Sequence, residues 1–275
     1  MKTDKTHITT SSRNHSYGEP GGKVSTDEIF ISVRDLRKSI AGQNILCGVD
    51  LDIRKGETLV VIGRSGEGKS VFLKHLIGLM YPDSGSIRVE GKEIVGLKER
   101  QLRDVRRKIG ILFQDGALFD SMTVAENVAF PLVEEGIRDR EVLLQRVGQA
   151  LEKVELAEHM AKMPINISGG MRKRVALARA IINEPECILY DEPTSGLDPV
   201  VSESIDRLIR RMQKELNVTS LVVTHDMQSV FRIADRVAYL REGKIYFLGT
   251  PEELRDSGDR YVRSFVEGRQ VEEGD

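Results

Sequence analysis

The stretch TLVVIGRSGEGKSVFLKHLIGLM, residues 58–80, decides the fold. Its opening run TLVVI is apolar and β-branched, which predicts a buried strand. The run GRSGEGKS (63–70) matches the pattern Gly-x-x-x-x-Gly-Lys-Ser, and VFLKHLIGLM after it is apolar nearly all round, as in a helix packed inside a domain. A strand, a glycine-rich loop and a helix in this order predict a phosphate-binding loop.

Each residue type in this loop has a physical role. Glycines let backbone N–H groups wrap phosphate oxygens, Lys69 can neutralise the β- and γ-phosphates, and the Ser70 hydroxyl can bind Mg²⁺. A match to the pattern arises in roughly one chain of this length in a hundred at average residue usage, but here it has the required strand and helix on its two sides. The predicted nucleotide-binding residues are Gly63, Arg64, Ser65, Gly66, Glu67, Gly68, Lys69 and Ser70.

Composition sets limits on the rest of the chain. With 275 residues and a formal net charge of −2, the chain is long enough for one large domain with a sub-domain, or for two domains, and has no global basic character that would indicate nucleic acid binding. The two cysteines, Cys47 and Cys187, have no metal or redox spacing and are expected to be reduced thiols of a cytoplasmic protein.

The two ends and two charged clusters have simple interpretations. Residues 1–28 are polar, contain no signal peptide, and are predicted to be a disordered tail. No apolar run approaches the roughly 20 residues of a membrane span, so a membrane role requires a partner. The basic clusters at 103–108 and 172–174 are interpreted as solvated helix faces.

The pattern along the chain indicates an α/β fold with additions. Short apolar runs over 29–62 predict a small antiparallel β layer that leads into the buried strand, and helical periodicity over about 117–185 predicts a helical sub-domain. After it, CILYDEP, VVSESIDRLIRRMQKEL and SLVVTHD alternate strand and helix signals, which favours parallel βαβ units. The main domain is expected over 29–250, with a helical tail over 251–275.

Polar side chains at three predicted strand ends converge on one edge of the sheet. Asp191 and Glu192 end the strand CILYD, and they are the candidates for holding Mg²⁺ and for orienting or deprotonating an attacking water. His225 ends SLVVT, and Gln114 follows IGILF, where a glutamine can reach the metal or the water. Ligands bind at this edge in α/β sheets, so we predict Glu192, His225 and Gln114 to be catalytic, and Ser70, Gln114 and Asp191 to bind the metal.

A second anion-binding helix end is predicted at NISGGMRKRVALARAI, residues 166–181. Ser168, Gly169 and Gly170 stand before a helical pattern, and a helix N-terminus carries roughly +0.5 charge. From a helical sub-domain these residues cannot easily fold back onto their own phosphate loop, so we expect them to cap the γ-phosphate of a second subunit. Asp198, in the loop SGLD, would lie at the same junction.

These motifs together resemble the ATP-binding cassette (ABC) ATPases over residues 29–250. The phosphate loop, Gln114, ISGGM, ILYDEP, SGLD and His225 occur in the order typical of that family. The resemblance implies a P-loop cassette with a RecA-like α/β core, the cofactors ATP and Mg²⁺, and composite sites shared head-to-tail between two cassettes. It also implies that a groove near Gln114 grips a membrane subunit.

A finer resemblance is to the cassettes of Mla-type, MCE-associated phospholipid transporters. It rests on FQDGALFDSMTVAENVAFPL, on Met171 in place of the usual signature glutamine, and on DRYVRSFVEGR. It implies an integral permease partner, an MCE-domain lipid-binding protein, a small STAS-type protein, and a place at the cytoplasmic face of the bacterial inner membrane. The alternatives are the ATPase of a polar-solute importer or of a solvent or lipophile exporter, and a soluble cassette protein outside transport.

One position departs from the family pattern. Most cassettes stack an aromatic residue on adenine where this chain has Ile40. Stacking is worth about 1–3 kcal/mol in nucleic-acid sites, so an aliphatic residue there predicts weak discrimination between bases.

Overall fold

The computed structural model describes residues 28–269 and contains two sheets. The predicted tail 1–28 therefore lies outside the described residues except for Glu28, and so do residues 270–275. The larger sheet has six strands in the order β10-β9-β3-β8-β7-β6, all parallel apart from the antiparallel pair β9 and β10. Its strands are β3 (Thr58–Ile62), β6 (Ile109–Leu112), β7 (Cys187–Asp191), β8 (Thr219–Thr224), β9 (Arg236–Arg241) and β10 (Lys244–Gly249).

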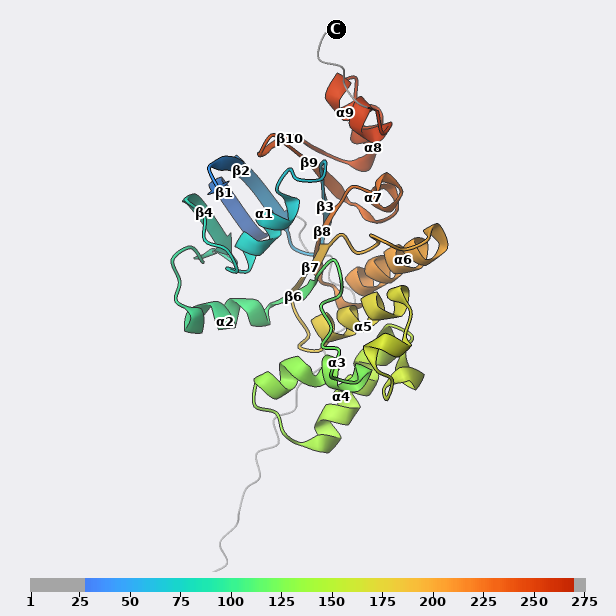
Figure 1. Ribbon diagram of the computed structural model, residues 1–275. Coiled ribbons are helices and arrows are strands. Elements are labelled where there is room, and N and C mark those ends of the chain that lie inside the picture. The colour runs from blue at the N-terminus through green and yellow to red at the C-terminus, as the bar shows by residue number, and fades with distance from the viewer. Residues whose placement is uncertain (1–27, 270–275) are drawn as a thin grey trace, which may run out of the picture.

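The smaller sheet is antiparallel and lies on the side of the larger sheet that carries α1 (Figure 1). It has the order β2-β1-β4-β5, and β1 and β2 form a long hairpin. Its strands are β1 (Ile29–Ile40), β2 (Gln43–Arg54), β4 (Ser84–Val89) and β5 (Lys92–Glu93). The predicted antiparallel layer is confirmed.

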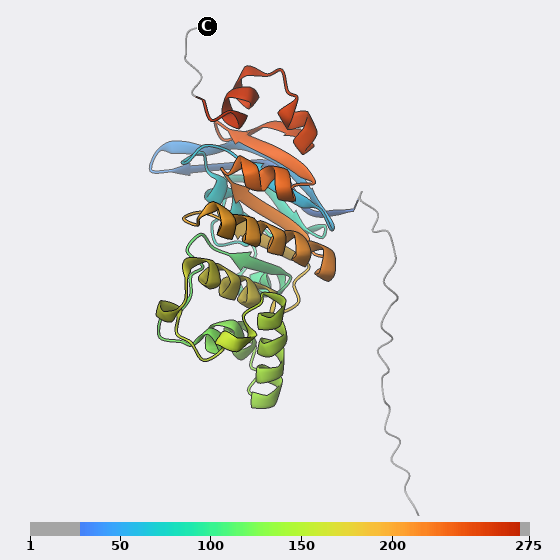
Figure 2. The same ribbon diagram turned by 90° about the vertical axis from the view of Figure 1, so that its right-hand side faces the viewer.

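Helices complete the fold. They are α1 (Lys69–Leu76), α2 (Glu99–Arg107), α3 (Val124–Glu134), α4 (Arg140–Lys153), α5 (Gly169–Ile181), α6 (Pro199–Leu216), α7 (Met227–Ile233), α8 (Pro251–Arg255) and α9 (Arg260–Val266), with short 3₁₀ turns at Ala157–His159 and Pro164–Asn166. Helices α3, α4 and α5 lie together at one end of the molecule, and α8 and α9 lie at the other (Figures 1 and 2).

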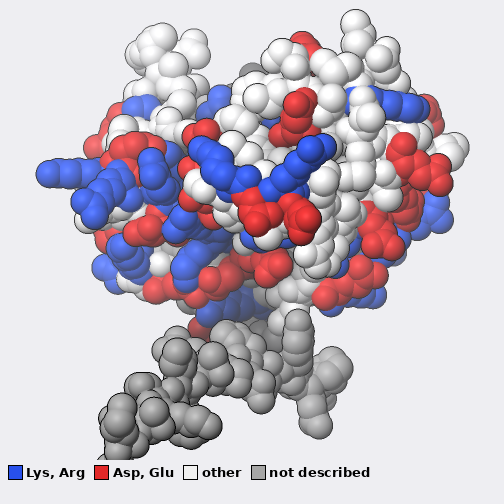
Figure 3. Space-filling view, turned by 90° about the horizontal axis from the view of Figure 1, so that it is seen from below, with Lys and Arg blue, Asp and Glu red and all other residues white. Residues whose placement is uncertain are grey.

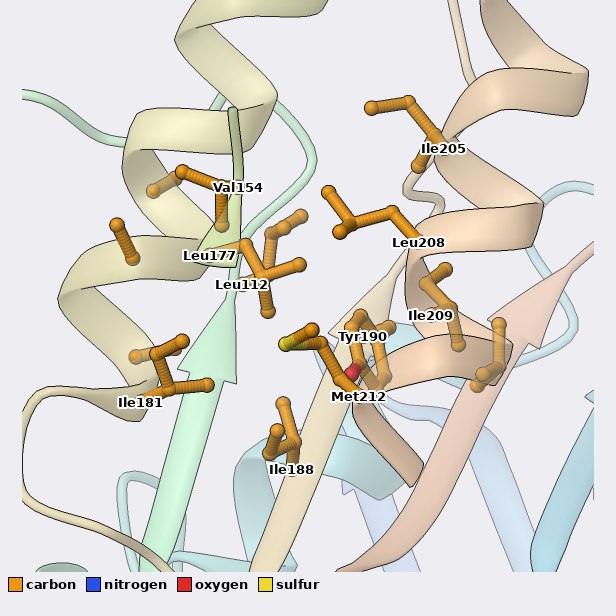
Figure 4. Close-up of a cluster of buried hydrophobic side chains, with 14 of the residues drawn as sticks. Leu112, Val154, Leu177, Ile181, Ile188, Tyr190, Ile205, Leu208, Ile209 and Met212 are labelled. Atoms are coloured by element: carbon orange, nitrogen blue, oxygen red, sulfur yellow. The ribbon is translucent and has the colours of Figure 1, made fainter. Parts of the chain in front are cut away.

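The central sheet separates two hydrophobic cores. Strand β3 is buried along its whole length, and because side chains alternate across a strand, Val60 and Ile62 face one core while Leu59 and Val61 face the other. The first core lies against α5 and α6, where Leu177 and Leu208 approach the sheet residue Tyr190 (Figure 4). The second core joins the sheet to α1 and the antiparallel layer. The predicted α/β architecture is thus confirmed.

Helix α2 carries the first basic cluster, and Arg103 and Arg107 are exposed on it, as expected of a solvated helix face. Leu102 and Val105 are its buried residues, three positions apart, and its other side chains are charged or polar. Arg106 explains its position, because its guanidinium donates hydrogen bonds to the carbonyls of Ile77 (2.9 Å) and Gly78 (3.1 Å) just after α1. Seen from below, basic side chains interspersed with acidic ones occupy the side of the molecule where α2 lies (Figure 3).

The two cysteines are free, as expected, but they differ in access. Cys187 lies in the central strand β7, where it is fully buried and burial raises the pKa of its thiol. Cys47 lies in β2 and is only half-buried. No helix of residues 28–269 has the length and apolar composition needed to cross a bilayer.

Candidate active site

The phosphate loop connects the end of β3 to the start of α1. Gly66 (φ 87°) and Gly68 (φ 96°) adopt the left-handed backbone conformation that glycine tolerates best. Packing also requires glycine, since a Cβ on Gly68 would lie 2.8 Å from the Ile45 side chain and one on Gly63 would lie 2.6 Å from the Leu240 carbonyl oxygen. The loop is therefore shaped by the two neighbouring strands β2 and β9 as well as by its own sequence.

Lys69 is held over this loop. Its Nζ donates to the carbonyl oxygens of Gly63 (2.8 Å) and Arg64 (3.2 Å) and lies 3.5 Å from Oε1 of Glu192. The residue is 6% exposed, so the ammonium is nearly desolvated. A desolvated cation beside open backbone N–H groups is a strong anion site.

Ser70 and Asp191, the two predicted metal ligands of the loop and of β7, lie side by side. The Ser70 Oγ donates to Oδ1 of Asp191 at 2.8 Å. Burial raises the pKa of Asp191, and the hydrogen bond from Ser70 opposes that rise. Both residues stand at the carboxyl edge of the sheet, where the loop connections of parallel strands leave room for a ligand.

Glu192 and His225 form a direct pair. The His225 Nδ1 lies 2.9 Å from Oε2 of Glu192, joining the ends of β7 and β8. Glu192 has φ 46°, uncommon for a residue with a side chain, and its N–H donates to the Val223 carbonyl at 2.9 Å. The neighbouring strand thus holds the Glu192 carboxylate in one direction, toward Lys69 and His225.

Gln114, Glu192 and His225 line one cavity with the phosphate loop. The cavity measures about 300 Å³, and Ser65, Lys69 and Ser70 also line it. Gly63, Arg64 and Glu67 do not. Glu67 instead accepts a hydrogen bond from the Arg64 backbone N–H at 2.9 Å, which closes the loop turn.

Lys173 is a site residue that the sequence interpretation missed. It lies in the second basic cluster but is buried, so the solvated-face interpretation is wrong for this residue. Its Nζ donates to the backbone carbonyls of Gln114 and, at 3.3 Å, Glu192, and burial lowers its pKa. Lys173 thereby connects α5 to the two loops that carry the predicted catalytic side chains.

The SGG segment lies outside the nucleotide cavity. Ser168 caps α5, its Oγ accepting from the Met171 N–H at 3.2 Å, and its side chain is exposed. Ser168, Gly169 and Gly170 do not line the phosphate-loop cavity. Asp198 is an exposed cap as well, accepting from the N–H groups of Val200 and Val201 at the start of α6, each at 3.0 Å.

Two aliphatic residues near the site have different positions. Ile40 ends β1 at the hairpin turn, 39% exposed, and does not line the cavity. Ile45, on the returning strand, does line it and packs against Gly68. Sequence spacing did not identify Ile45, because its contact depends on the register of the hairpin.

A phosphate loop at the end of a central parallel strand, with acids at the end of a neighbouring strand, defines a P-loop nucleotide hydrolase. The family model described as ABC transporter matches residues 46–195, slightly more than half of the chain. The chain belongs to this family, and it is an ATPase cassette.

Relatives of known name agree with the family and differ in cargo. The chain is 41% identical to the "Probable ribonucleotide transport ATP-binding protein mkl" of Mycobacterium leprae, covering 88% of this chain and 70% of the relative. It is 39% identical to the "Intermembrane phospholipid transport system ATP-binding protein MlaF" of Haemophilus influenzae, covering 87% and 90%. A solved structure of the ATP-binding cassette MJ0796, dimeric and bound to ADP and Pi, matches with a TM-score of 0.74 at 31% identity, covering 80% of this chain and 98% of that one.

Proposed function

We propose that this chain is the ATP-hydrolysing subunit of a transporter that moves phospholipids between bacterial membranes. The contact that carries the hydrolytic part is the Glu192–His225 pair, 2.9 Å apart beside the phosphate loop. The phospholipid cargo is supported by the MlaF relative, which the chain matches over 90% of that protein's length, and by Met171 in the signature.

The residues around Ser70 fit a magnesium ion. Mg²⁺ prefers hard oxygen ligands and keeps several waters while bridging phosphates. The Ser70 hydroxyl and the Asp191 carboxylate already lie 2.8 Å apart, and Gln114 lines the same cavity. When bound, Mg²⁺ would neutralise charge on the β- and γ-phosphates; Ser70 and Gln114 would ligate it, and Asp191 would orient its shell.

The chain's own groups would divide the remaining work. Lys69 would exchange its contacts with the Gly63 and Arg64 carbonyls for phosphate oxygens, which are stronger acceptors because they are charged. Glu192 would accept a hydrogen bond from the attacking water and orient it in line with the γ-phosphate. His225 would hold the Glu192 carboxylate through Nδ1 and present its other ring nitrogen toward the γ-phosphate.

The complete site requires a second copy of the chain. Ser168, Gly169 and Gly170 lie outside their own cavity, yet they leave backbone N–H groups open at a helix N-terminus. In a head-to-tail pair they would meet the γ-phosphate held by the partner's loop. The dimeric state of the MJ0796 cassette with ADP and Pi supports this arrangement.

The proposed assembly places the cassette pair at the cytoplasmic face of the inner membrane. There it would act on an integral permease, with an MCE-domain lipid-binding protein and a STAS-type protein as further partners. The groove between β6, α3 and α5 is the candidate permease surface; it is lined by Phe113, Phe119 and Phe130 and measures about 540 Å³. No nucleic acid partner is proposed.

A polar-solute importer is the second candidate, because the mkl relative is named for ribonucleotide transport. The two cargoes can be separated with the native complex. We expect extraction in detergent to recover a multi-span permease with bound phospholipid, and phospholipid to stimulate its ATPase activity. Stimulation by ribonucleotides instead, or co-purification with ribosomes, would contradict the phospholipid proposal.

The hydrolytic role is tested separately with Glu192→Gln. The amide keeps the volume but loses basicity, so kcat should fall between about 100-fold and 10,000-fold while ATP binding persists. The variant should accumulate as an ATP-closed dimer in size-exclusion chromatography. Turnover at the wild-type rate would remove Glu192 from this role.

A further inference from the structure

A buried carboxylate lies between α6 and α7, outside the nucleotide cavity. The Asp206 side chain is 0% exposed, and its Oδ2 accepts hydrogen bonds from Ser229 Oγ (2.9 Å) and Arg232 Nη1 (3.2 Å). Its Oδ1 has no hydrogen-bond partner among the described residues. Burying a carboxylate is costly unless it is paired, so its presence on the mostly apolar buried face of α6 calls for a reason.

Ser229 is shared between two carboxylates. Its Oγ lies 2.9 Å from Asp206 Oδ2 and 3.0 Å from Asp226 Oδ2, and Thr194 Oγ1 is 3.5 Å away. A serine hydroxyl has one proton to donate. It can therefore donate to Asp206 or to Asp226, but not to both at once, and the two arrangements hold the Asp226 side chain differently.

Asp226 determines the turn that carries His225. Its N–H donates to Thr224 Oγ1 at 3.0 Å, so the turn closes around the histidine. Its Oδ1 accepts from the Gln228 N–H at 2.9 Å and thereby caps α7. The position of the His225 ring beside Glu192 depends on this turn, because the ring itself is largely exposed.

The same network reaches the loop after Glu192. Thr194 lies two residues beyond Glu192 and is 5% exposed, facing the buried Ser229. A cavity of about 320 Å³ above the network is lined by Glu192, His225 and the loop at Ser195–Leu197. The Asp206–Ser229–Asp226 network thus adjoins both the loop after Glu192 and the turn at His225. Among the described residues it contacts neither the phosphate loop nor Lys69.

We propose that Asp206 is a positioning residue for His225, acting through the shared Ser229 hydroxyl and the Asp226 turn. When Ser229 donates to Asp226, the turn is fixed and the ring stays at Glu192. When Ser229 donates to Asp206, the turn is released while α7 stays intact. This inference depends on ATP hydrolysis by the cassette and not on the identity of its cargo.

The experiment compares Ser229→Ala with Ser220→Ala, which removes an equally buried serine hydroxyl from β8 outside the network. Misplacing a catalytic group by about 1 Å can cost as much as 100-fold, so we expect Ser229→Ala to lower kcat by about tenfold with the KM for ATP within about twofold. Ser220→Ala should hydrolyse ATP like the wild type. Asp206→Leu removes the acceptor that competes with Asp226, so Ser229 should donate to Asp226 throughout and kcat should be at least that of the wild type. Asp206→Asn keeps an acceptor oxygen and should behave like the wild type.

A double variant separates positioning from stability. In a His225→Ala background, measured by long single-turnover assays, Ser229→Ala should cause no further loss, since residues acting through one group are not additive. The ring ¹⁵N signal of His225 should also shift in Ser229→Ala and not in Ser220→Ala. The proposal is overturned if Ser229→Ala has the kcat of Ser220→Ala, or if the His225 signal is unchanged. An equal loss in both backgrounds also overturns it. If Asp206→Leu does not fold, Ser229→Ala alone provides the test. A wild-type protein without ATPase activity would instead contradict the proposed function.

Discussion

Two helices of this chain begin at glycine-rich segments, and they differ in what surrounds them. Helix α1 starts after Gly68 with no side-chain cap, and its end lies in a cavity built by its own chain from Lys69, Glu192 and Gln114. Helix α5 starts after Ser168, which caps it, and that end is outside the cavity. Both ends suit an anion, but only α1 has the cation and acids needed for chemistry.

The glycines show the same difference in more detail. A Cβ at Gly63 or Gly68 would meet atoms at 2.6 Å or 2.8 Å, and one at Gly170 would lie 2.5 Å from Val201 Cγ1 of α6. A Cβ at Gly169 would be 3.4 Å from Leu197, an ordinary contact. Close packing within a single chain therefore explains why Gly63, Gly68 and Gly170 lack a side chain. At Gly169 a side chain would fit, so packing within the chain does not explain this glycine.

The largest effect is expected at the α1 end. Lys69→Ala removes the buried cation of the loop, and two charged hydrogen bonds of about 1.5–3 kcal/mol each correspond to a loss of at least about 100-fold in ATP affinity. Isothermal titration calorimetry measures this directly. Lys74→Ala, at an exposed lysine of the same helix, is the control and should bind normally. Unchanged affinity in Lys69→Ala would mean that α1 is not the primary phosphate site.

The α5 end should respond in the opposite way. Gly169→Asp fits its own chain and is favoured by the helix dipole, so folding and ATP binding should persist. Hydrolysis and ATP-dependent dimerisation should fall by about 100-fold, the scale seen when one anion-stabilising donor is lost. Gly170→Ala should instead lose about 1–3 kcal/mol of folding free energy through its contact with Val201. Full hydrolysis by Gly169→Asp would make Ser168–Gly170 a helix cap only.

Mixing two defective chains sharpens this prediction. In a head-to-tail pair of Gly169→Asp and Lys69→Ala subunits, one composite site carries both changes and the other carries neither. Some ATPase activity should therefore return in the mixture. Two variants that stay inactive at every ratio would contradict the shared-site arrangement.

A smaller effect is expected where the two regions are joined. Lys173→Met keeps an apolar stem but loses the hydrogen bonds to the Gln114 and Glu192 carbonyls. Without these hydrogen bonds the two loops should no longer be held in fixed positions relative to each other. We therefore expect kcat to fall about tenfold and ATP affinity to stay the same. Lys162→Met, at an exposed lysine of the same lobe, is the matched control. Equal kcat in the two variants would reduce Lys173 to a packing residue.

The smallest effect concerns the base. Ile40 and Ile29 stand at opposite ends of β1 and are 39% and 40% exposed, so tyrosine can be placed at either one. A stacking contact of about 1 kcal/mol would change ATP affinity roughly fivefold, in Ile40→Tyr and not in Ile29→Tyr. ATP and GTP hydrolysis rates give the comparison. If both variants behave alike, Ile40 does not contact the base.

Local signals explain what the sequence predicted well. The strand, loop and helix of residues 58–76 are contiguous, and the polar residues at Asp191, Glu192 and His225 follow strands whose apolar runs are unmistakable. The roles of Lys173 and Asp206 could not be predicted from the sequence. A charged residue in an amphipathic helix gives the same sequence pattern whether its side chain faces water or a buried partner. The Lys173 partner at Gln114 is 59 positions away, and Asp206 meets Ser229 across 23.

The different solvent access of the two cysteines makes the native chain suitable for spectroscopy without prior mutagenesis. Cys187 is buried in β7 with a raised pKa, so a maleimide probe should react at the half-buried Cys47 alone. Cys47 lies two residues from Ile45, on the strand that packs against the phosphate loop. A closed pair of cassettes would then carry one dye per subunit, and the distance between the two dyes would report the opening and closing of the nucleotide sites in real time.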